Sequence, residues 1–166
     1  FQIGRDVSLS ELGRQLSMSK NTVERYLDLL EKVFVIYKRR GFSRNLRKEI
    51  TKSNRYFFYD NGIRNTLIGN FNPLTIRNDV GELWENYITT ERIKRLEYEM
   101  TFCKSYFWRT YDQKEIDLVE ERDGKLHAYE FKWQPVKGKI PRDWLKGYPD
   151  AEYRFIHIEN YIDFIT

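Results

Sequence analysis

The sequence predicts an α/β fold (α+β overall) with two modules, a helix-turn-helix with two strands and a mixed sheet covered by helices. Helix-capping signals and aromatic strands occupy residues 1–72, whereas a long amphipathic helix and a hairpin signal lie in residues 73–166. Charge divides similarly, because residues 1–77 hold 15 Lys and Arg against 7 Asp and Glu, and residues 78–166 hold 14 against 18. Such asymmetry between halves indicates modules with different roles.

Two helices are expected first. Ser8 and Glu11 form a capping box that predicts a helix as far as about Ser17. Ser19 then caps a longer helix over residues 20–34. Its apolar side chains recur at helical spacing as Val23, Leu27, Leu30 and Phe34. A short helix, a tight turn and a second helix make a helix-turn-helix pattern.

Strands at 35–38 and 55–59, separated by a basic loop at 39–52, complete the pattern of a winged helix. In a DNA-binding winged helix, the start of the second helix meets the major groove. The predicted nucleic-acid-binding residues are Lys20, Asn21, Thr22, Arg25, Arg39, Arg40, Arg44, Arg47 and Lys48. Glu24 and Asp28 lie on the same exposed side and oppose phosphate contact. Many winged helices instead dock proteins, so that alternative stays open.

A turn at 60–62 and a short helix at 63–68 end the first module. The second module has predicted helices at 78–98 and 141–146, and strands at 105–109, on both sides of Asp123-Gly124, and at 153–158. The loop at 69–73 is the expected boundary between the modules, because it is rich in Gly, Asn and Pro. The resulting order is α-β-β-β-α-β, typical of a mixed sheet with helices against it. The sequence alone leaves open whether Glu82 or Glu85 of the long helix points toward the hairpin.

The hairpin around Asp123-Gly124 organises the candidate site. Asp-Gly favours a two-residue type I′ turn, and counting outward from it fixes the register. The expected pairs are Val119 with Ala128, Leu118 with Tyr129, Asp117 with Glu130, Ile116 with Phe131, and Glu115 with Lys132. Alternation then places Ile116, Leu118, Tyr129 and Phe131 on a core face, and Glu115, Asp117, Glu130 and Lys132 on the other.

Two carboxylates placed opposite each other repel, and a divalent cation would compensate them. Mg2+ or Mn2+ fits this chemistry, because magnesium favours oxygen ligands, usually one or two carboxylates with several waters. Lys132 lies on the same face as Asp117 and Glu130, where its charge would stabilise developing phosphate charge. The alternative is an ordinary solvated face with an ion pair between Glu115 and Lys132.

Composition narrows the class of protein. The sequence holds no apolar run long enough to span a membrane and no signal peptide, so we expect a soluble, cytoplasmic protein without a membrane partner. One cysteine, Cys103, excludes an internal disulfide, and two histidines make a zinc site unfavourable. The chain begins at Phe1 without a methionine, so we expect it to be a fragment of a longer protein.

The order of these motifs resembles two known groups. A helix with a glutamate, a strand, then I-D and E-x-K on the next two strands is similar to the core of the PD-(D/E)XK nuclease superfamily. The whole chain resembles the C-terminal region of a prokaryotic AAA+-type ATPase family. The matching blocks are T-V-E-R-Y-L-D-L-L-E at 22–31, Y-F-F-Y-D-N-G-I-R-N at 56–65, G-E-L-W-E-N-Y-I at 81–88, Y-F-W-R-T at 106–110, E-I-D-L-V at 115–119 and Y-E-F-K at 129–132.

The resemblance implies a winged helix over residues 1–72 and a restriction-endonuclease-like domain over residues 73–166. It implies a catalytic set of Glu85, Asp117, Glu130 and Lys132, with the metal held by Asp117 and Glu130. For the acid on the helix, the resemblance favours Glu85 over Glu82, because the family places that acid just before the Asn of E-N-x-I/V. It also implies an ATPase module preceding these residues as a partner. No GxxxxGK[ST] loop occurs, so this stretch cannot bind ATP in that way.

Three functions follow from these expectations. The leading one is an Mg2+-dependent phosphodiesterase that acts on DNA, with a winged helix that binds DNA largely independently of sequence. The second is a catalytically inactive DNA-binding or protein-docking part of the ATPase, since a fold does not fix a function. A helix-turn-helix transcription regulator is the third, but it leaves the acidic cluster unexplained.

Overall fold

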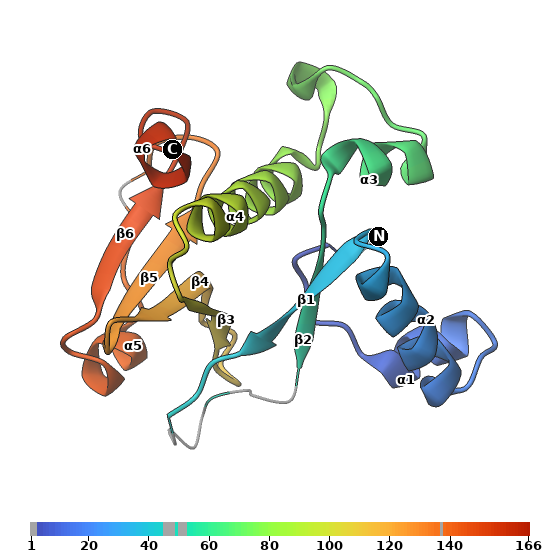
Figure 1. The fold of residues 1–166 in the computed structure, drawn as a ribbon, viewed down its shortest axis with the longest axis horizontal. Coiled ribbons are helices and arrows are strands. Elements are labelled where there is room, and N and C mark those ends of the chain that lie inside the picture. Colours follow the sequence, from blue (N-terminus) through green and yellow to red (C-terminus); the bar gives the residue numbers. More distant parts are fainter. Residues whose placement is uncertain (1–2, 45–48, 50–52, 137) are drawn as a thin grey trace.

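The structure is a computed structural model that describes residues 3–44, 49, 53–136 and 138–166. Its elements are α1 (Leu9–Gln15), α2 (Lys20–Lys32), β1 (Ile36–Gly41), β2 (Asn54–Phe58), α3 (Asn61–Ile68), a 3-10 turn (Leu74–Ile76), α4 (Val80–Tyr98), β3 (Lys104–Arg109), β4 (Glu115–Arg122), β5 (Lys125–Phe131), α5 (Arg142–Gly147), β6 (Glu152–Ile156) and α6 (Ile162–Ile165). The predicted α/β class with a mixed sheet is confirmed (Figure 1).

The described strands form one sheet in the order β2-β1-β3-β4-β5-β6. β1 and β2 pair antiparallel, as the predicted wing requires, but β1 also pairs in parallel with β3. The strands of the first half therefore extend the sheet of the second half. The module boundary after residue 72 stays a prediction, although the sheet runs across it.

Apolar clusters cover both faces of the sheet. On one face α4 contributes Trp84 and Ile88, which pack with Leu118, Tyr129, Phe131 and Ile156. On the other face Trp144 and Tyr148 of the α5 region pack against Trp108, Ile116, Val119 and Ala128. A third cluster joins Ile3 to Ile36, Tyr37, Phe57 and Phe58 of the β1–β2 pair. The core therefore follows the sheet, and α4 lies across it (Figure 1).

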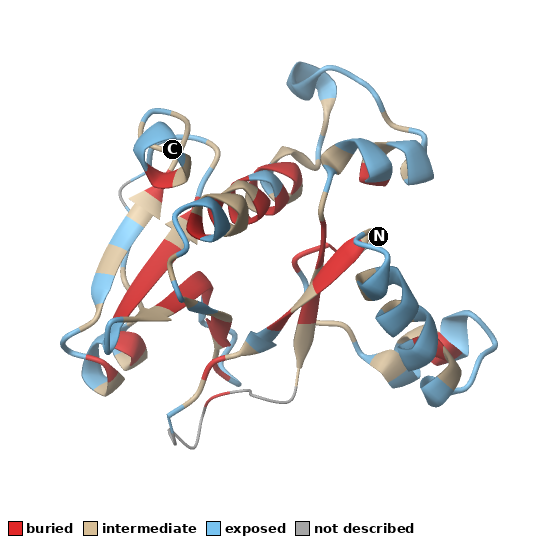
Figure 2. Cartoon of the chain, viewed as in Figure 1, coloured by how far each residue is buried: buried red, intermediate tan, exposed pale blue. Residues whose placement is uncertain are grey.

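The α1–α2 pair is capped as predicted but is weakly embedded. The side chain of Ser8 accepts a hydrogen bond from the Glu11 amide, and the side chain of Ser19 accepts one from the Thr22 amide. Val23 is the buried residue of α2, and both helices are pale blue over most of their length in Figure 2. The predicted helix over 20–34 is confirmed as far as Lys32, and among the apolar residues that predicted it Leu30 is 38% exposed and Phe34 is 71% exposed.

The hairpin turn is confirmed, because Asp123 and Gly124 both have positive φ, as a type I′ turn requires. The predicted register is confirmed from Arg122–Lys125 to Leu118–Tyr129. Beyond Leu118 it is wrong. β4 is irregular against β3, since Tyr106 pairs with Val119 but Trp108 pairs with Ile116.

This irregularity changes which residues share a face. One extra β4 residue between the two pairs reverses the alternation, as a bulge does. Ile116 consequently packs with Val119 and Ala128, on the face opposite Leu118. Asp117 stands at the irregular position, and its Oδ2 atom accepts the Phe131 amide at 2.7 Å. The predicted opposite pairing of Asp117 with Glu130 is replaced by this side-chain contact.

Smaller differences concern the ends of elements. β1 extends through Gly41 into the predicted basic loop, because two neighbouring strands hydrogen-bond to it. Asp60 caps α3, so the predicted turn at 60–62 opens that helix. The final helix α6 was not predicted, because its four residues are too few to show a helical pattern. Among the described residues, no helix is both long and apolar enough to cross a membrane.

Candidate functional site

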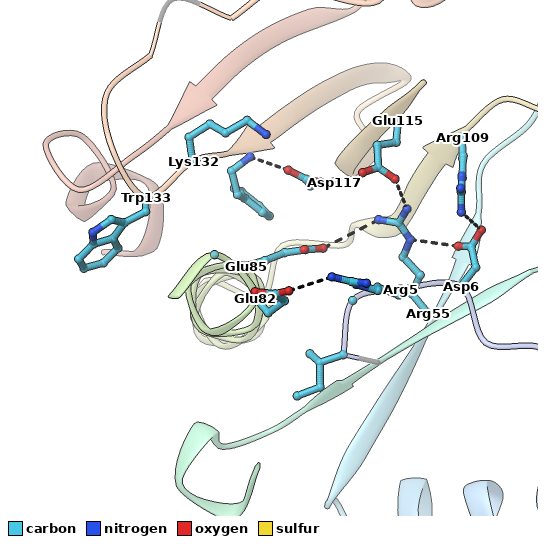
Figure 3. A pocket seen from close by; sticks show the side chains of 14 residues that line it. Arg5, Asp6, Arg55, Glu82, Glu85, Arg109, Glu115, Asp117, Lys132 and Trp133 are labelled. Atoms are coloured by element: carbon cyan, nitrogen blue, oxygen red, sulfur yellow. Dashed lines mark hydrogen bonds and ion pairs between the residues drawn. The ribbon is translucent and has the colours of Figure 1, made fainter. Parts of the chain in front are cut away.

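A cavity of about 610 Å³ lies where the two halves of the chain meet. Its lining residues are Ile3, Gly4, Arg5, Asp6, Arg55, Gly81, Glu82, Glu85, Arg109, Glu115, Asp117, Phe131, Lys132 and Trp133. Figure 3 shows the charged members converging from the N-terminal segment, β2, α4 and the β3–β5 strands. Of the four predicted catalytic residues, Glu85, Asp117 and Lys132 line this cavity, and Glu130 does not.

Asn86 fixes the helix that carries Glu85. The Asn86 amide oxygen accepts the Phe58 N–H at 2.8 Å, and its amide nitrogen donates to the Phe58 carbonyl at 2.9 Å. Both groups are buried, so a mismatch would leave polar atoms without partners. Asn86 thereby locks α4 to the end of β2 and directs the preceding residue into the cavity. Sequence reasoning assigned Asn86 no role beyond its place in the motif.

Of the two glutamates left open, Glu85 is the one that points inward. Glu82 binds the exposed Arg5 at 3.0 Å and keeps 33% of its side-chain surface exposed. The Glu85 side chain is 19% exposed, and Gly4 lies directly against it. A Cβ atom on Gly4 would come within 2.9 Å of the Glu85 carboxylate, and Gly4 has φ +66°. Glycine at this position therefore lets the N-terminal segment close over Glu85.

Lys132 lies just past the end of β5 and contacts Glu130 rather than Glu115. Its Nζ atom is 2.8 Å from a Glu130 carboxylate oxygen, and the Tyr153 hydroxyl contacts the other oxygen at 3.4 Å. The predicted ion pair between Glu115 and Lys132 is wrong, because Glu115 is 2.6 Å from the guanidinium of Arg55. Glu130 therefore contacts the cavity-lining Lys132 without lining the cavity itself.

The buried acids have perturbed pKa values. Burial, with a smaller contribution from Glu130, raises the pKa of Asp117 to about 7. Burial and the nearby Asp117 raise the pKa of Glu85 well above its usual range. Burial alone would lower the pKa of Lys132, but the hydrogen bond to Glu130 outweighs it and the pKa is raised. Acids shifted this way in a cleft are typical of functional sites, though structural ion pairs also shift pKa values.

Sequence reasoning missed the cations contributed by the first half of the chain and by β3. Arg55 contacts Asp6 at 3.2 Å and Glu115 at 2.6 Å, while Arg109 also pairs with Asp6. An antiparallel bridge between Asp6 and Arg55 ties the N-terminal segment to β2. Arg55 lies in a strand rich in aromatic residues, which predicts a core strand, so no local pattern identifies Arg55 as a site residue. Only the sheet that spans both halves brings it to the acids.

The predicted nucleic-acid-binding residues differ in their exposure. Lys20, Asn21, Arg25, Arg40 and Arg44 are exposed, and Thr22 is half-buried beside its cap. Arg39 is buried at 3% exposure and lies 5.0 Å from the Phe57 ring centroid, so its predicted place on an exposed wing is wrong. Alternation on β1 turns Arg39 inward and Arg40 outward. Arg47 and Lys48 lie outside the described residues.

The donor set of the cavity suits a hard cation. Glu85 and Asp117 line the cavity and interact electrostatically, and Glu85 Oε1 is buried without a hydrogen-bond partner in the described part of the chain. Magnesium needs one or two carboxylates and keeps several waters. Across the described ranges, however, no three His, Cys, Asp or Glu side chains gather closely enough to hold a metal ion by themselves. The residues fit a cation bound by two carboxylates.

Each half of the chain matches the model of a protein family without an assigned function. Residues 1–74 match the family described as "Domain of unknown function (DUF8612)", and residues 80–156 match "Domain of unknown function (DUF4143)". Uncharacterized proteins of Mycobacterium bovis and Mycobacterium tuberculosis are 28% identical over 131 residues. An uncharacterized protein of Haemophilus influenzae is 29% identical over 129 residues.

These matches cover 75–78% of this chain but only 29% of each relative, so the chain spans under a third of those proteins. No solved structure shows a significant match. Neither family model covers half of the chain. The chain thus joins a segment similar to the DUF8612 family to a segment similar to the DUF4143 family.

Proposed function

We propose that this chain carries an Mg2+- or Mn2+-dependent phosphodiesterase site of the PD-(D/E)XK type that acts on DNA. The observation that carries the proposal is the convergence of Glu85, Asp117 and Lys132 in one cavity from three separate elements. Two buried carboxylates next to a lysine match the needs of metal-assisted hydrolysis, because a bound metal displaces the protons that burial favours on them.

The predicted ligand Glu130 lies outside the cavity and pairs with Lys132, so in this reading Asp117 and Glu85, the two buried carboxylates of the cavity, would hold the metal. The metal would supply Lewis-acid stabilisation of phosphate charge. Hydrolysis adds a water oxygen to phosphorus, breaks one phosphorus–oxygen ester bond and leaves a proton on the departing oxygen. The attacking water releases its proton to solvent, and the departing oxygen takes its proton from solvent. Lys132 presents its ammonium group to the growing negative charge. The exposed Arg5 adds positive charge at the cavity, suited to a phosphate backbone.

The setting we propose is the C-terminal part of an AAA+-type ATPase. The resemblance noted above and the longer relatives support this setting, since the chain aligns with 29% of each relative. The winged helix of residues 1–72 would bind DNA through exposed Lys20, Arg25, Arg40 and Arg44. Phosphate contacts of this kind are independent of sequence.

A second candidate, a protein-docking role for a catalytically inactive domain, is favoured by one face of α2. Tyr26, Leu29 and Val33 recur there at helical spacing and are 54–56% exposed. An apolar face at the predicted DNA-reading helix suits the ATPase portion of a longer chain better than it suits phosphates. DNA binding by α2 and docking by α2 exclude each other for the same surface.

Cleavage assays distinguish the two candidates. Wild type incubated with Mn2+ or Mg2+ and end-labelled single- or double-stranded DNA should yield metal-dependent products. Asp117→Asn should abolish them, because it removes a charged ligand while keeping its shape. Glu99→Gln is the matched control, since Glu99 is an exposed carboxylate paired with Arg95 at the far end of α4. Wild type that never cuts, even as the full-length protein, would leave the docking role.

A further inference from the structure

Arg55 is a buried cation inside the acidic cavity. Its side chain is 3% exposed, and its guanidinium lies 4.4 Å from the Phe107 ring centroid. Nε contacts Asp6 at 3.2 Å and Nη2 contacts Glu115 at 2.6 Å. Acceptors on both sides and an aromatic ring on its face hold the guanidinium in one orientation. Figure 3 shows it lying between Asp6, Glu85 and Glu115.

The remaining edge of the guanidinium faces Glu85 without completing a hydrogen bond. Arg55 Nη1 is 3.9 Å from Glu85 Oε1, which is beyond hydrogen-bond range. The same Glu85 oxygen has no hydrogen-bond partner among the residues that the structure describes. Gly4 packs against the Glu85 carboxylate and donates its N–H to the Tyr56 carbonyl at 3.2 Å, so the N-terminal segment covers one side of Glu85. Arg55 and Glu85 therefore attract each other electrostatically without forming a hydrogen bond.

We propose that Arg55 is a tethered cation that competes with a divalent metal for the carboxylate of Glu85, which the proposed metal site shares with Asp117. This inference rests on the proposed metal site. A metal ion held by Asp117 and Glu85 would share the Glu85 carboxylate with a guanidinium of the same sign, so that each weakens the attraction of the other for Glu85. Without the metal, Arg55 supplies the positive charge that the acids need. The N-terminal segment, through Asp6, thereby sets the metal affinity of a site built by the second half of the chain.

Removing the Arg55 charge should strengthen metal binding. Calorimetric titration of Arg55→Gln with Mn2+ should give a dissociation constant about tenfold lower than that of wild type. Arg5→Gln is the matched control, because Arg5 lines the same cavity but is 68% exposed and pairs with Glu82. Its dissociation constant should change by no more than about threefold. Arg55→Gln that binds Mn2+ as weakly as wild type, or more weakly, overturns the proposal.

A measurement on wild type covers the case in which the buried substitution prevents folding. In protein labelled with 15N arginine, the Arg55 Nε–H signal should shift saturably as Mg2+ is added. The Arg92 Nε–H signal should stay fixed, because Arg92 is paired with Glu120 in the core. Saturable metal binding that leaves the Arg55 signal unmoved overturns the competition.

The outcomes also separate this inference from the proposed function. Mn2+ binding by Arg55→Gln but not by wild type supports the competition and refutes a working metal site in the native chain. Absence of binding in wild type, Arg55→Gln and the more conservative Arg55→Lys overturns both ideas. Binding by wild type with no gain in Arg55→Gln retains the proposed function and removes the role of Arg55.

Discussion

The protonated state of Asp117 has a direct consequence for stability. Its pKa is raised from 3.8 to about 7 in the folded chain, mainly by burial. Between these values the folded state keeps a proton that the unfolded state has lost. Stability contributed by this group is therefore largest below about pH 4, falls as the pH rises to about 7, and is level above that. A difference of about three pKa units corresponds to about 4 kcal/mol, at about 1.4 kcal/mol per unit.

Asp117→Asn isolates this effect, because the amide keeps an oxygen that can accept the Phe131 N–H but does not ionise. Urea unfolding measured from about pH 5 to about pH 8 should show wild type losing stability more steeply than Asp117→Asn. The difference between them should grow by up to about 1.4 kcal/mol per pH unit until it levels off. Glu99→Gln should follow the wild-type profile. Parallel profiles for wild type and Asp117→Asn would refute the idea that Asp117 is held protonated.

Two further predictions concern the core and the basic surface. Arg92→Met should lower the free energy of unfolding, measured in urea, by about 3–5 kcal/mol. The reason is that it removes the partner that binds the fully buried Glu120 carboxylate at 2.7 and 2.9 Å. A loss under about 1 kcal/mol would contradict this. Replacing Arg40 and Arg44 by Ala should flatten the salt dependence of DNA affinity measured by fluorescence anisotropy, because fewer counterions are released. An unchanged slope would show that these two arginines make no phosphate contact.

The local signals in the sequence predicted the local structure well. Ser8, Ser19 and the Asp123-Gly124 turn act over a few residues, so their patterns specify their structures almost alone. The hairpin register followed from the turn as far as Leu118. Further out, the bulge in β4 depends on pairing with β3, a strand about ten residues away, and nothing in the alternation announces it.

The candidate site was predicted only where its residues come from the second half of the chain. Glu85, Asp117 and Lys132 were placed together correctly. Arg55 was not, because its position depends on parallel pairing between β1 and β3, a contact of long sequence separation. Arg39 was misplaced for a related reason, since the sheet extends through residues read as an exposed loop and buries alternate side chains.

The central claim, catalysis at this cavity, depends on the charge of Lys132. The most direct measurement is single-turnover cleavage of DNA in Mn2+ by wild type and Lys132→Met, with folding and metal binding of both proteins verified beforehand. Our account predicts a rate about 100- to 1000-fold lower for Lys132→Met, the usual cost of losing a preorganised group that stabilises the transition state. Equal cleavage rates for the two folded, metal-bound proteins would contradict it.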